Sequence, residues 1–217
     1  MTFQDRTDAG IRLAETLKER VQPNTVVLAI PRGGVEVGIQ VAKRLNCAFE
    51  LLIVRKLPFP DNPESGFGAI AEDGSSVVFD RFAQTVPDTQ RQQIYEAQQK
   101  EIQSRIRTLR KGRPLPEIKG RTVILIDDGI AMGSTMQASV AMCRNQHAAK
   151  IVVAAPVSAG RTKSEFQALA DQAAAFTDAL HYVSLFDVGE DELLARVHLI
   201  RAAGESIILQ TFIYDDD

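Results

Sequence analysis

The chain has 217 residues, 45% of them hydrophobic and 24% charged, with a formal net charge of −3 at pH 7. This composition is typical of a globular protein, and the length favours a single domain over residues 1–217. The small negative charge without a long basic run argues against nucleic-acid binding, and no signal peptide or membrane-spanning apolar run is recognisable, so we expect a cytoplasmic protein.

The first part of the chain predicts a parallel α/β sheet. Apolar residues at helical spacing from Thr7 to Val21 predict a helix, and the apolar run from Thr25 to Ile30 predicts a buried strand. A predicted helix from Val35 to about Leu45 and a predicted strand from Phe49 to Val54 follow. Strand, turn, helix and strand in this order favour parallel strands joined by a right-handed connection.

Two short polar motifs follow these strands. Pro31-Arg32-Gly33-Gly34 misses the spacing of a dinucleotide-binding turn, so it is either a plain strand-to-helix turn or a turn that binds an anion. Arg55 and Lys56 come directly after the strand that ends at Val54, at the edge where such sheets bind ligands. These two cations either neutralise an anionic ligand or simply mark a solvated strand end.

The next segment predicts a loop, a hairpin and a long helix. Leu57 to Gly68 contains prolines at three positions and glycines at two, which predicts a mobile loop. Asp73-Gly74 lies between two short apolar runs and predicts a hairpin. Asp88 to Lys111 carries a narrow apolar stripe and predicts a long surface helix. Hairpin and helix together predict an insertion over about residues 67–118.

The stretch from Val123 to Thr135 carries the most specific chemical signal. Its apolar start predicts a strand buried on both faces, and two acids, Asp127 and Asp128, follow that strand. A short loop then leads into a helix from about Met136 to His147, which Ser134 or Thr135 can cap with a hydroxyl. The loop residues are Gly129, Ile130, Ala131, Met132 and Gly133. Free N–H groups at a helix start favour an anion, so acids beside them fit a sugar phosphate.

Other interpretations of this stretch explain less of it. A P-loop requires Lys before the Ser or Thr, and Gly133 stands there instead. A site for a metal alone does not explain the glycine loop. A purely structural turn stays open from the local residues.

The remaining chain predicts further strands and helices. Ile151 to Val157 predicts the next sheet strand, and Tyr182 to Phe186 predicts a short strand or extended segment. Arg161 to Ala170 and Asp187 to Ala203 predict helices, and Ala173 to Thr177 predicts an edge strand. These elements extend the same α/β pattern.

The stretch from Val123 to Thr135 resembles the phosphoribosyl diphosphate (PRPP) binding motif of type I phosphoribosyltransferases, with its apolar strand, two acids and loop ending Gly-x-Thr. Together with Phe3-x-Asp-Arg-x-x-Ala-Gly10, the Pro31–Gly34 turn and Val54-Arg-Lys56, it is most similar to a bacterial group known only as predicted phosphoribosyltransferases. The resemblance covers about Thr25 to Thr177. It implies a central, mostly parallel sheet flanked by helices, a small hood from about residues 1–20 and 178–217, and a homodimer.

The resemblance also implies an activity: transfer of the phosphoribosyl group of PRPP to a nitrogenous base or amine, with release of diphosphate. Asp127 and Asp128 would hold the ribose hydroxyls and Mg²⁺, directly or through water. The loop from Gly129 to Thr135 would bind the 5-phosphate. The turn with Arg32, Gly33 and Gly34 would bind the leaving diphosphate, at a peptide bond, Pro31–Arg32, that is often cis in the family. Positive charge would come from Arg32, Arg55 and Lys56, and stacking on the acceptor from Tyr182 or Phe186.

Two positions depart from the family pattern. Met132 replaces the usual Thr, which removes a hydroxyl contact with the phosphate. Ala131 stands where hypoxanthine-guanine enzymes carry Asp, so the resemblance does not imply a 6-oxopurine acceptor. The alternatives are a non-catalytic regulatory protein that binds PRPP or a nucleotide on the same fold, and a Mg²⁺-dependent hydrolase that uses the acid pair.

Overall fold

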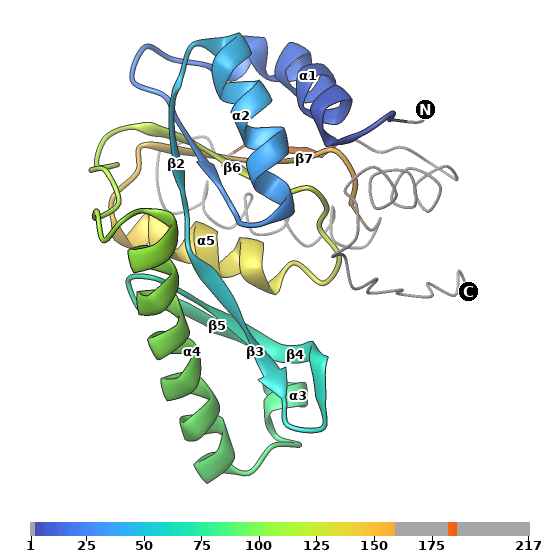
Figure 1. Ribbon diagram of the computed structural model, residues 1–217, viewed down its shortest axis with the longest axis vertical. Helices are drawn as coiled ribbons and strands as arrows, with labels where there is room; N and C mark the ends of the chain where they lie inside the picture. Colours follow the sequence, from blue (N-terminus) through green and yellow to red (C-terminus); the bar gives the residue numbers. More distant parts are fainter. Residues whose placement is uncertain (1–2, 159–181, 186–217) are drawn as a thin grey trace.

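The structure, a computed structural model, describes residues 3–158 and 182–185 (Figure 1). Within this part of the chain, five strands form a central sheet in the order β2-β1-β6-β7-β8. The strands are Val26–Ala29 (β1), Ala48–Leu51 (β2), Thr122–Ile126 (β6), Lys150–Ala155 (β7) and Tyr182–Leu185 (β8). Every pairing between them is parallel, and each strand overlaps a predicted one, which confirms the predicted fold class. The strand predicted to end at Val54 ends earlier, at Leu51.

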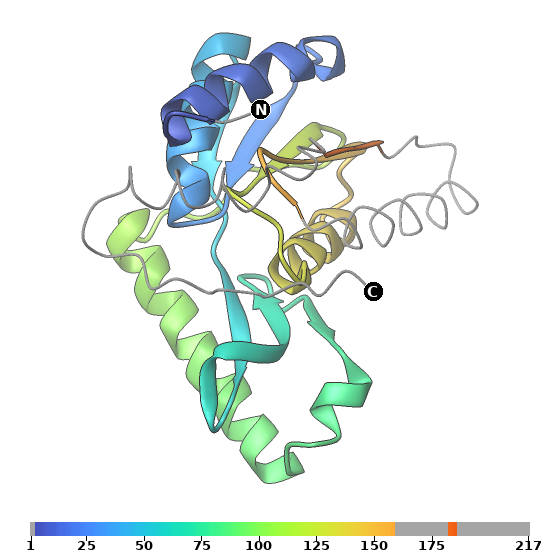
Figure 2. The same ribbon diagram turned by 90° about the vertical axis from the view of Figure 1, so that its right-hand side faces the viewer.

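Helices cover both faces of this sheet, with α1 (Arg6–Leu17) and α2 (Gly33–Leu45) on one face and α5 (Ser134–Asn145) on the other (Figures 1 and 2). Alternate residues of β6 divide between the two layers. Ile124 and Ile126 pack with α1 and α2, whereas Val123 and Leu125 pack with α5. Because a fully buried Leu or Ile contributes about 1.5–3 kcal/mol, this double burial fixes the strand that leads into Asp127.

Helix α1 approaches α2 closely at Gly10. A Cβ atom at this position would lie 2.7 Å from the carbonyl oxygen of Val37 and 2.8 Å from the Cβ of Gln40. A larger residue would therefore push the two helices apart. The predicted first helix is confirmed, although its last turn, Lys18–Arg20, is a 3-10 helix (η1).

Residues 54–109 form a second unit, called the arm below, which projects from the core (Figure 1). The arm is a three-stranded antiparallel sheet in the order β3-β4-β5, accompanied by two helices. Its elements are Val54–Phe59 (β3), Asn62–Ala71 (β4), Ser76–Val78 (β5), Asp80–Ala83 (α3) and Asp88–Leu109 (α4). Leu57, Phe67, Ile70 and Ile102 give the arm a hydrophobic core of its own. The predicted long surface helix is thus confirmed as α4.

The prediction of a mobile loop from Leu57 to Gly68 is wrong in its secondary structure. These residues belong to the hairpin of β3 and β4, whose pairing shifts register on both sides of Pro58. Strand β3 lies at the edge of the arm sheet, where proline is tolerated because no ladder hydrogen bond is lost. The hairpin predicted at Asp73-Gly74 is confirmed as the turn between β4 and β5, with Gly74 at φ +91°.

A buried ion pair joins the arm to the core sheet. Arg110 is only 1% exposed, and its Nη1 donates to the Leu51 carbonyl at 3.3 Å and to Glu72 Oε1 at 3.1 Å. Its Nη2 donates to Glu72 Oε2, and Glu72 Oε1 also accepts the Ile53 N–H at 3.3 Å. Burial raises the pKa of Glu72, and the charge of Arg110 opposes that rise. The pair therefore fixes the point at which the chain leaves the core sheet for the arm.

Several predictions fall wholly or partly outside the described residues. The predicted helices at 161–170 and 187–203, the edge strand at 173–177 and Phe186 lie there, as does most of the 178–217 part of the hood. The arm sheet begins at Val54, earlier than the start predicted for the insertion. No helix among the described residues is both long and apolar enough to cross a membrane.

Candidate functional site

Two chain segments meet at the carboxyl edge of the central sheet. Strand β6 ends at Ile126, and Asp127 and Asp128 follow it directly. Asp128 donates its backbone N–H to Asp127 Oδ1 at 2.9 Å, and Asp127 donates its own N–H to the Ala154 carbonyl of β7 at 3.4 Å. Because β1 is the neighbour of β6, the Pro31–Gly34 turn that follows it lies at the same edge, where open α/β sheets bind ligands.

Glycines allow that turn to lie directly against the acids. A Cβ atom at Gly33 would lie 1.8 Å from Asp128 Oδ2, and one at Gly34 would lie 2.7 Å from the Ile126 carbonyl oxygen. Neither position has room for a side chain while the acids stay in place. The Pro31–Arg32 peptide bond is cis, as the family resemblance implied.

The loop from Gly129 to Gly133 rests on the end of β7. Ile130 donates its N–H to the Val157 carbonyl at 3.0 Å, and it forms an isolated parallel bridge with Ser158. A Cβ atom at Gly129 would lie 3.0 Å from a Val157 methyl group. The loop is therefore fixed by the segment that follows β7, in addition to β6 before it and α5 after it.

The predicted hydroxyl cap of α5 is not formed. Gly133, at φ +76°, is the N-cap residue and makes no side-chain cap bond, and Ser134 is already the first helical residue. The first intrahelical bond runs from the Gln137 N–H to the Gly133 carbonyl at 2.8 Å. The N–H groups of residues 134–136 therefore precede the helical ladder and point out of the helix start. With the helix dipole, they favour an anion at this end.

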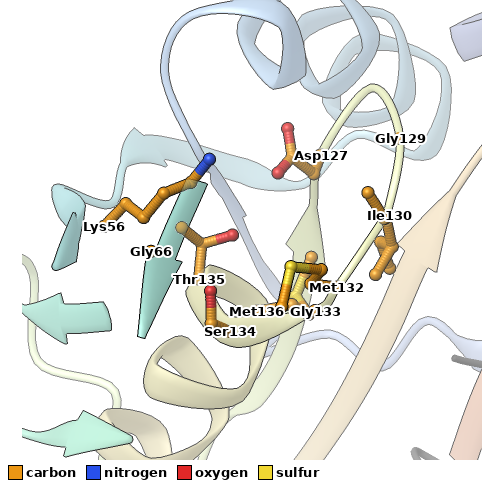
Figure 3. Close-up of a pocket in the computed structure, with 11 residues that line it drawn as sticks. Lys56, Gly66, Asp127, Gly129, Ile130, Met132, Gly133, Ser134, Thr135 and Met136 are labelled. Carbon is orange, nitrogen blue, oxygen red and sulfur yellow. The ribbon is translucent and has the colours of Figure 1, made fainter. Parts of the chain in front are cut away.

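A cavity of about 170 Å³ lies between this loop and the arm. Its lining consists of the loop, the start of α5, one acid and the arm hairpin: Lys56, Gly66, Asp127, Gly129, Ile130, Ala131, Met132, Gly133, Ser134, Thr135 and Met136. Figure 3 shows Lys56 reaching from the hairpin toward the cavity, opposite Asp127. A cation, a carboxylate and a helix start thus surround one small space.

Lys56 is held in this position by the hairpin itself. Its Nζ donates to the Glu64 carbonyl of β4 at 2.6 Å. A Cβ atom at Gly66 would lie 2.6 Å from Lys56 Cγ, so the glycine leaves the path of the lysine side chain open. Burial of the ammonium group lowers the pKa of Lys56, while the nearby charge of Glu64 opposes that shift.

The other predicted cations lie elsewhere. Arg55 is on the opposite face of β3 from Lys56, and its Nε donates to Gln98 Oε1 of α4 at 3.0 Å. It does not line the cavity. Arg32 is exposed at the start of α2, beside the glycine turn. Of the three cations, the structure brings only Lys56 into the cavity.

The predicted stacking residues are placed only by the backbone of β8. Tyr182 begins this strand and pairs with Val152, whereas Leu185 pairs with Ala155 at the end of β7. Tyr182 is therefore level with Ile124 of β6, two residues before the strand end that leads into the acids. Phe186 follows Leu185 outside the described residues.

Arg6, which belongs to the motif from Phe3 to Gly10, is a site residue to which the sequence alone assigns no role. It is 7% exposed, and its Nε and Nη2 donate to Asp128 Oδ2 at 3.0 and 2.8 Å. Its Nη1 lies 3.5 Å from Glu36 Oε2 on α2. The Arg6–Asp128 contact joins residues that are 122 positions apart, so no local pattern indicates it.

The two acids do not have equivalent surroundings. Burial of its carboxyl group, followed by the nearby charge of Asp128, raises the pKa of Asp127 well above its usual range. The Asp128 backbone N–H and the charge of Arg6 oppose this shift. A further cation or a hydroxyl donor beside Asp127 would therefore favour its ionised form.

These residues also fit a divalent metal that arrives with its ligand. The described residues contain no group of three or more His, Cys, Asp or Glu side chains that could hold a metal. Mg²⁺ is commonly held by one or two carboxylates together with substrate phosphates rather than by a complete protein cage. Asp127 and Asp128 meet that requirement.

Comparison with known proteins places these features in a family. The phosphoribosyl transferase domain family matches residues 3–177 of the chain. A protein of Mycobacterium tuberculosis that provisionally carries the name phosphoribosyl transferase is 37% identical over 202 residues, which are 89% of this chain and 46% of that protein. The chain therefore spans about half the length of this curated relative. The crystal structure of TT1426 from Thermus thermophilus is similar at a TM-score of 0.66 and 29% identity, covering 93% of this chain and 99% of that chain.

Proposed function

The chain belongs to the phosphoribosyltransferase family, and from this premise we propose that it transfers the phosphoribosyl group of PRPP to a nitrogenous acceptor and releases diphosphate. One observation carries the proposal: Asp127 and Lys56 face each other across a cavity whose remaining wall is the start of α5. The cavity offers a carboxylate for sugar hydroxyls, N–H groups for a phosphate and a cation for a leaving group. These are the groups that PRPP needs.

Binding in this site positions the reacting carbon. Asp127 and Asp128 accept hydrogen bonds from the ribose hydroxyls, and the N–H groups at the start of α5 hold the 5-phosphate. With both ends of the sugar fixed, its C1 atom can turn only one face toward the acceptor. Orientation of this kind contributes to rate because it replaces a chance encounter by a fixed geometry.

Departure of diphosphate leaves positive charge on the ribose and negative charge on the leaving group. Lys56 from the arm and Arg32 beside the glycine turn supply fixed positive charge for that leaving group. Mg²⁺, held by Asp127 and Asp128 when it is bound, supplies further charge neutralisation. Arg55 has no part in this step, because its side chain lies against α4.

Release of diphosphate from PRPP, followed across a panel of purines, pyrimidines and simple amines, tests this function. We expect release that depends on Mg²⁺ and on one class of acceptor. Release that is equal with and without any acceptor indicates a hydrolase instead. Tight PRPP binding without release, measured by calorimetry, indicates the regulatory alternative, in which the site binds but does not react.

Lys56→Met should lower kcat/KM for PRPP by about 10- to 30-fold, because one charge-assisted contact to the leaving group is lost. Arg55→Met is the matched control, since it removes the neighbouring charge from the other face of the same strand. Steady-state diphosphate release and the melting temperature should be measured for both variants. Equal losses of kcat/KM in the two variants would show that the charge of the arm acts only at a distance.

A further inference from the structure

Arg6 combines deep burial with contacts to a candidate ligand-binding acid. The guanidinium belongs to the first turn of α1, whose start is fixed by Asp5, which accepts the Asp8 N–H at 2.7 Å. Close packing of α1 on α2 at Gly10 fixes the helix as a whole. Arg6 is therefore presented to the acid pair by a rigid element and not by a loose chain end.

The contacts of Arg6 make the two carboxylate oxygens of Asp128 different from each other. Both Nε and Nη2 donate to Oδ2. Gly33 of the neighbouring turn lies against the whole carboxylate, since a Cβ atom there would lie 1.8 Å from Oδ2 and 2.7 Å from Oδ1. Neither of these donors is bonded to Oδ1 of Asp128. The side chain of Asp128 is 30% exposed, whereas that of Arg6 is 8% exposed. Arg6 therefore occupies and covers one oxygen and leaves the other to a ligand.

We propose that Arg6 is a positioning residue for PRPP binding: it fixes the rotation of the Asp128 carboxylate so that Oδ1 is presented to the ribose, and it does not itself contact the ligand. Neither Arg6 nor Asp128 is among the residues that line the cavity, so Arg6 acts on the ligand only through its contacts with Asp128. This inference rests on the function proposed above.

The same contacts make Arg6 a link between the two ligand-binding segments. Its Nη1 lies near Glu36, in the first turn of the helix that follows the glycine turn. Its Nε and Nη2 donate to Asp128, which lies just beyond the end of β6. Because Gly33 lies against Asp128 Oδ2, a rotation of the carboxylate would also press on the glycine turn. Loss of Arg6 should therefore disturb ribose binding more than a loss of charge alone.

The experiment is calorimetry with PRPP and Mg²⁺ on the full chain. The variants are Arg6→Met, Arg6→Lys, Asp128→Asn and the double variant of Arg6→Met with Asp128→Asn. Arg12→Met is the matched control, because Arg12 lies on the same helix but pairs with Asp8 at 3.0 Å and is 38% exposed. Melting temperatures are recorded for every variant.

We expect Arg6→Met to weaken PRPP binding by at least about tenfold, as removal of a partner that orients a ligand-binding group usually does. Arg6→Lys keeps the charge but not the paired donors, and should still bind roughly threefold more weakly than wild type. Arg12→Met should bind like wild type. In the Asp128→Asn background, Arg6→Met should cause less than about a twofold further loss, because its partner is already altered.

Four outcomes would overturn the inference. If Arg6→Met weakens binding equally in both backgrounds, Arg6 acts through the stability of α1 and not through Asp128. If Arg6→Lys, which preserves the charge and the packing, binds PRPP as tightly as wild type, orientation by paired donors is wrong even where Arg6→Met fails to fold. A wild-type protein that does not bind PRPP overturns both this inference and the proposed function, whereas normal binding by the Arg6 variants overturns the inference alone.

Discussion

Asp127→Asn should weaken PRPP binding by roughly 100-fold and at the same time raise the melting temperature at neutral pH. Binding is lost because Asn offers the ribose hydroxyls one neutral acceptor in place of a carboxylate. Stability rises because ionising the partly buried carboxyl group, beside the charge of Asp128, is unfavourable in the folded state. Asn keeps the oxygen that accepts the Asp128 N–H, so the local backbone is preserved.

The raised pKa of Asp127 determines how the stability of the folded protein changes with pH. An acid whose pKa is raised in the folded state binds its proton more tightly there than in the unfolded chain. Its contribution to stability is therefore present at low pH, and it is lost as the pH rises from the ordinary aspartate value of 3.8 through the raised value. In Asp127→Asn this loss is absent, and the difference from wild type should grow with pH.

Thermal melts between pH 4 and 8, together with calorimetry with PRPP, check both halves of this prediction. Asp61→Asn is the control, because Asp61 is an exposed carboxyl at the turn of the arm hairpin. It should change neither the slope of melting temperature against pH nor the affinity for PRPP. A variant at Asp127 that melts below wild type at neutral pH would show that the carboxylate is stabilised by Arg6 more than it is penalised by burial.

Arg110→Met should destabilise the protein by about 3–5 kcal/mol, because it leaves Glu72 buried without its cation. At about 2–4 °C for each kcal/mol in a chain of this size, the melting temperature should fall by roughly 6–20 °C. Arg113→Met is the matched control. Its side chain is 70% exposed and lies 3.7 Å from Glu50, so its loss should cost less than about 0.5 kcal/mol.

A second substitution separates the cost of the unpaired Glu72 charge from the cost of the lost Arg110 packing. Adding Glu72→Gln to Arg110→Met removes the unpaired charge while keeping an oxygen for the Ile53 N–H. The double variant should therefore recover a substantial part of the lost melting temperature, since removing both partners costs less than removing one. Urea unfolding should be used to convert the melting shifts into free energies. No recovery would mean that the cost lies in the packing of Arg110 and not in the charge of Glu72.

Local sequence patterns predict those elements whose structure depends mainly on residues close to them in the chain. The run of buried residues in β6 and the acids after it form one short segment, so the strand and the acid pair could both be predicted. Helix α4 could be predicted for the same reason, because its stripe of apolar residues repeats over many turns.

The errors arise where distant partners decide the structure. Leu57 to Gly68 contains residues that favour loops, but Val54 to Phe59 finds an antiparallel partner in β4 and lies at a sheet edge that tolerates proline. The cap of α5 was assigned to a hydroxyl, but Gly133 adopts the positive φ that starts the helix. Arg55 was predicted beside Lys56 in the site, but strand alternation turns it toward Gln98. Arg6 lies within the quoted motif from Phe3 to Gly10, but its role could not be predicted because its partner is 122 residues away.

The order of strands in the central sheet has a consequence for how the chain assembles. Strand β1 pairs with β6, so Val26 must find Val123, and the whole arm is synthesised between them. The arm pairs only strands that follow each other in sequence, which closes short loops at low entropic cost. We therefore expect the arm to acquire structure while the middle of the central sheet still lacks a strand. Asp128 can meet Arg6 only after β6 has taken its place, so a growing chain can complete the acid pair only after the whole arm has been synthesised.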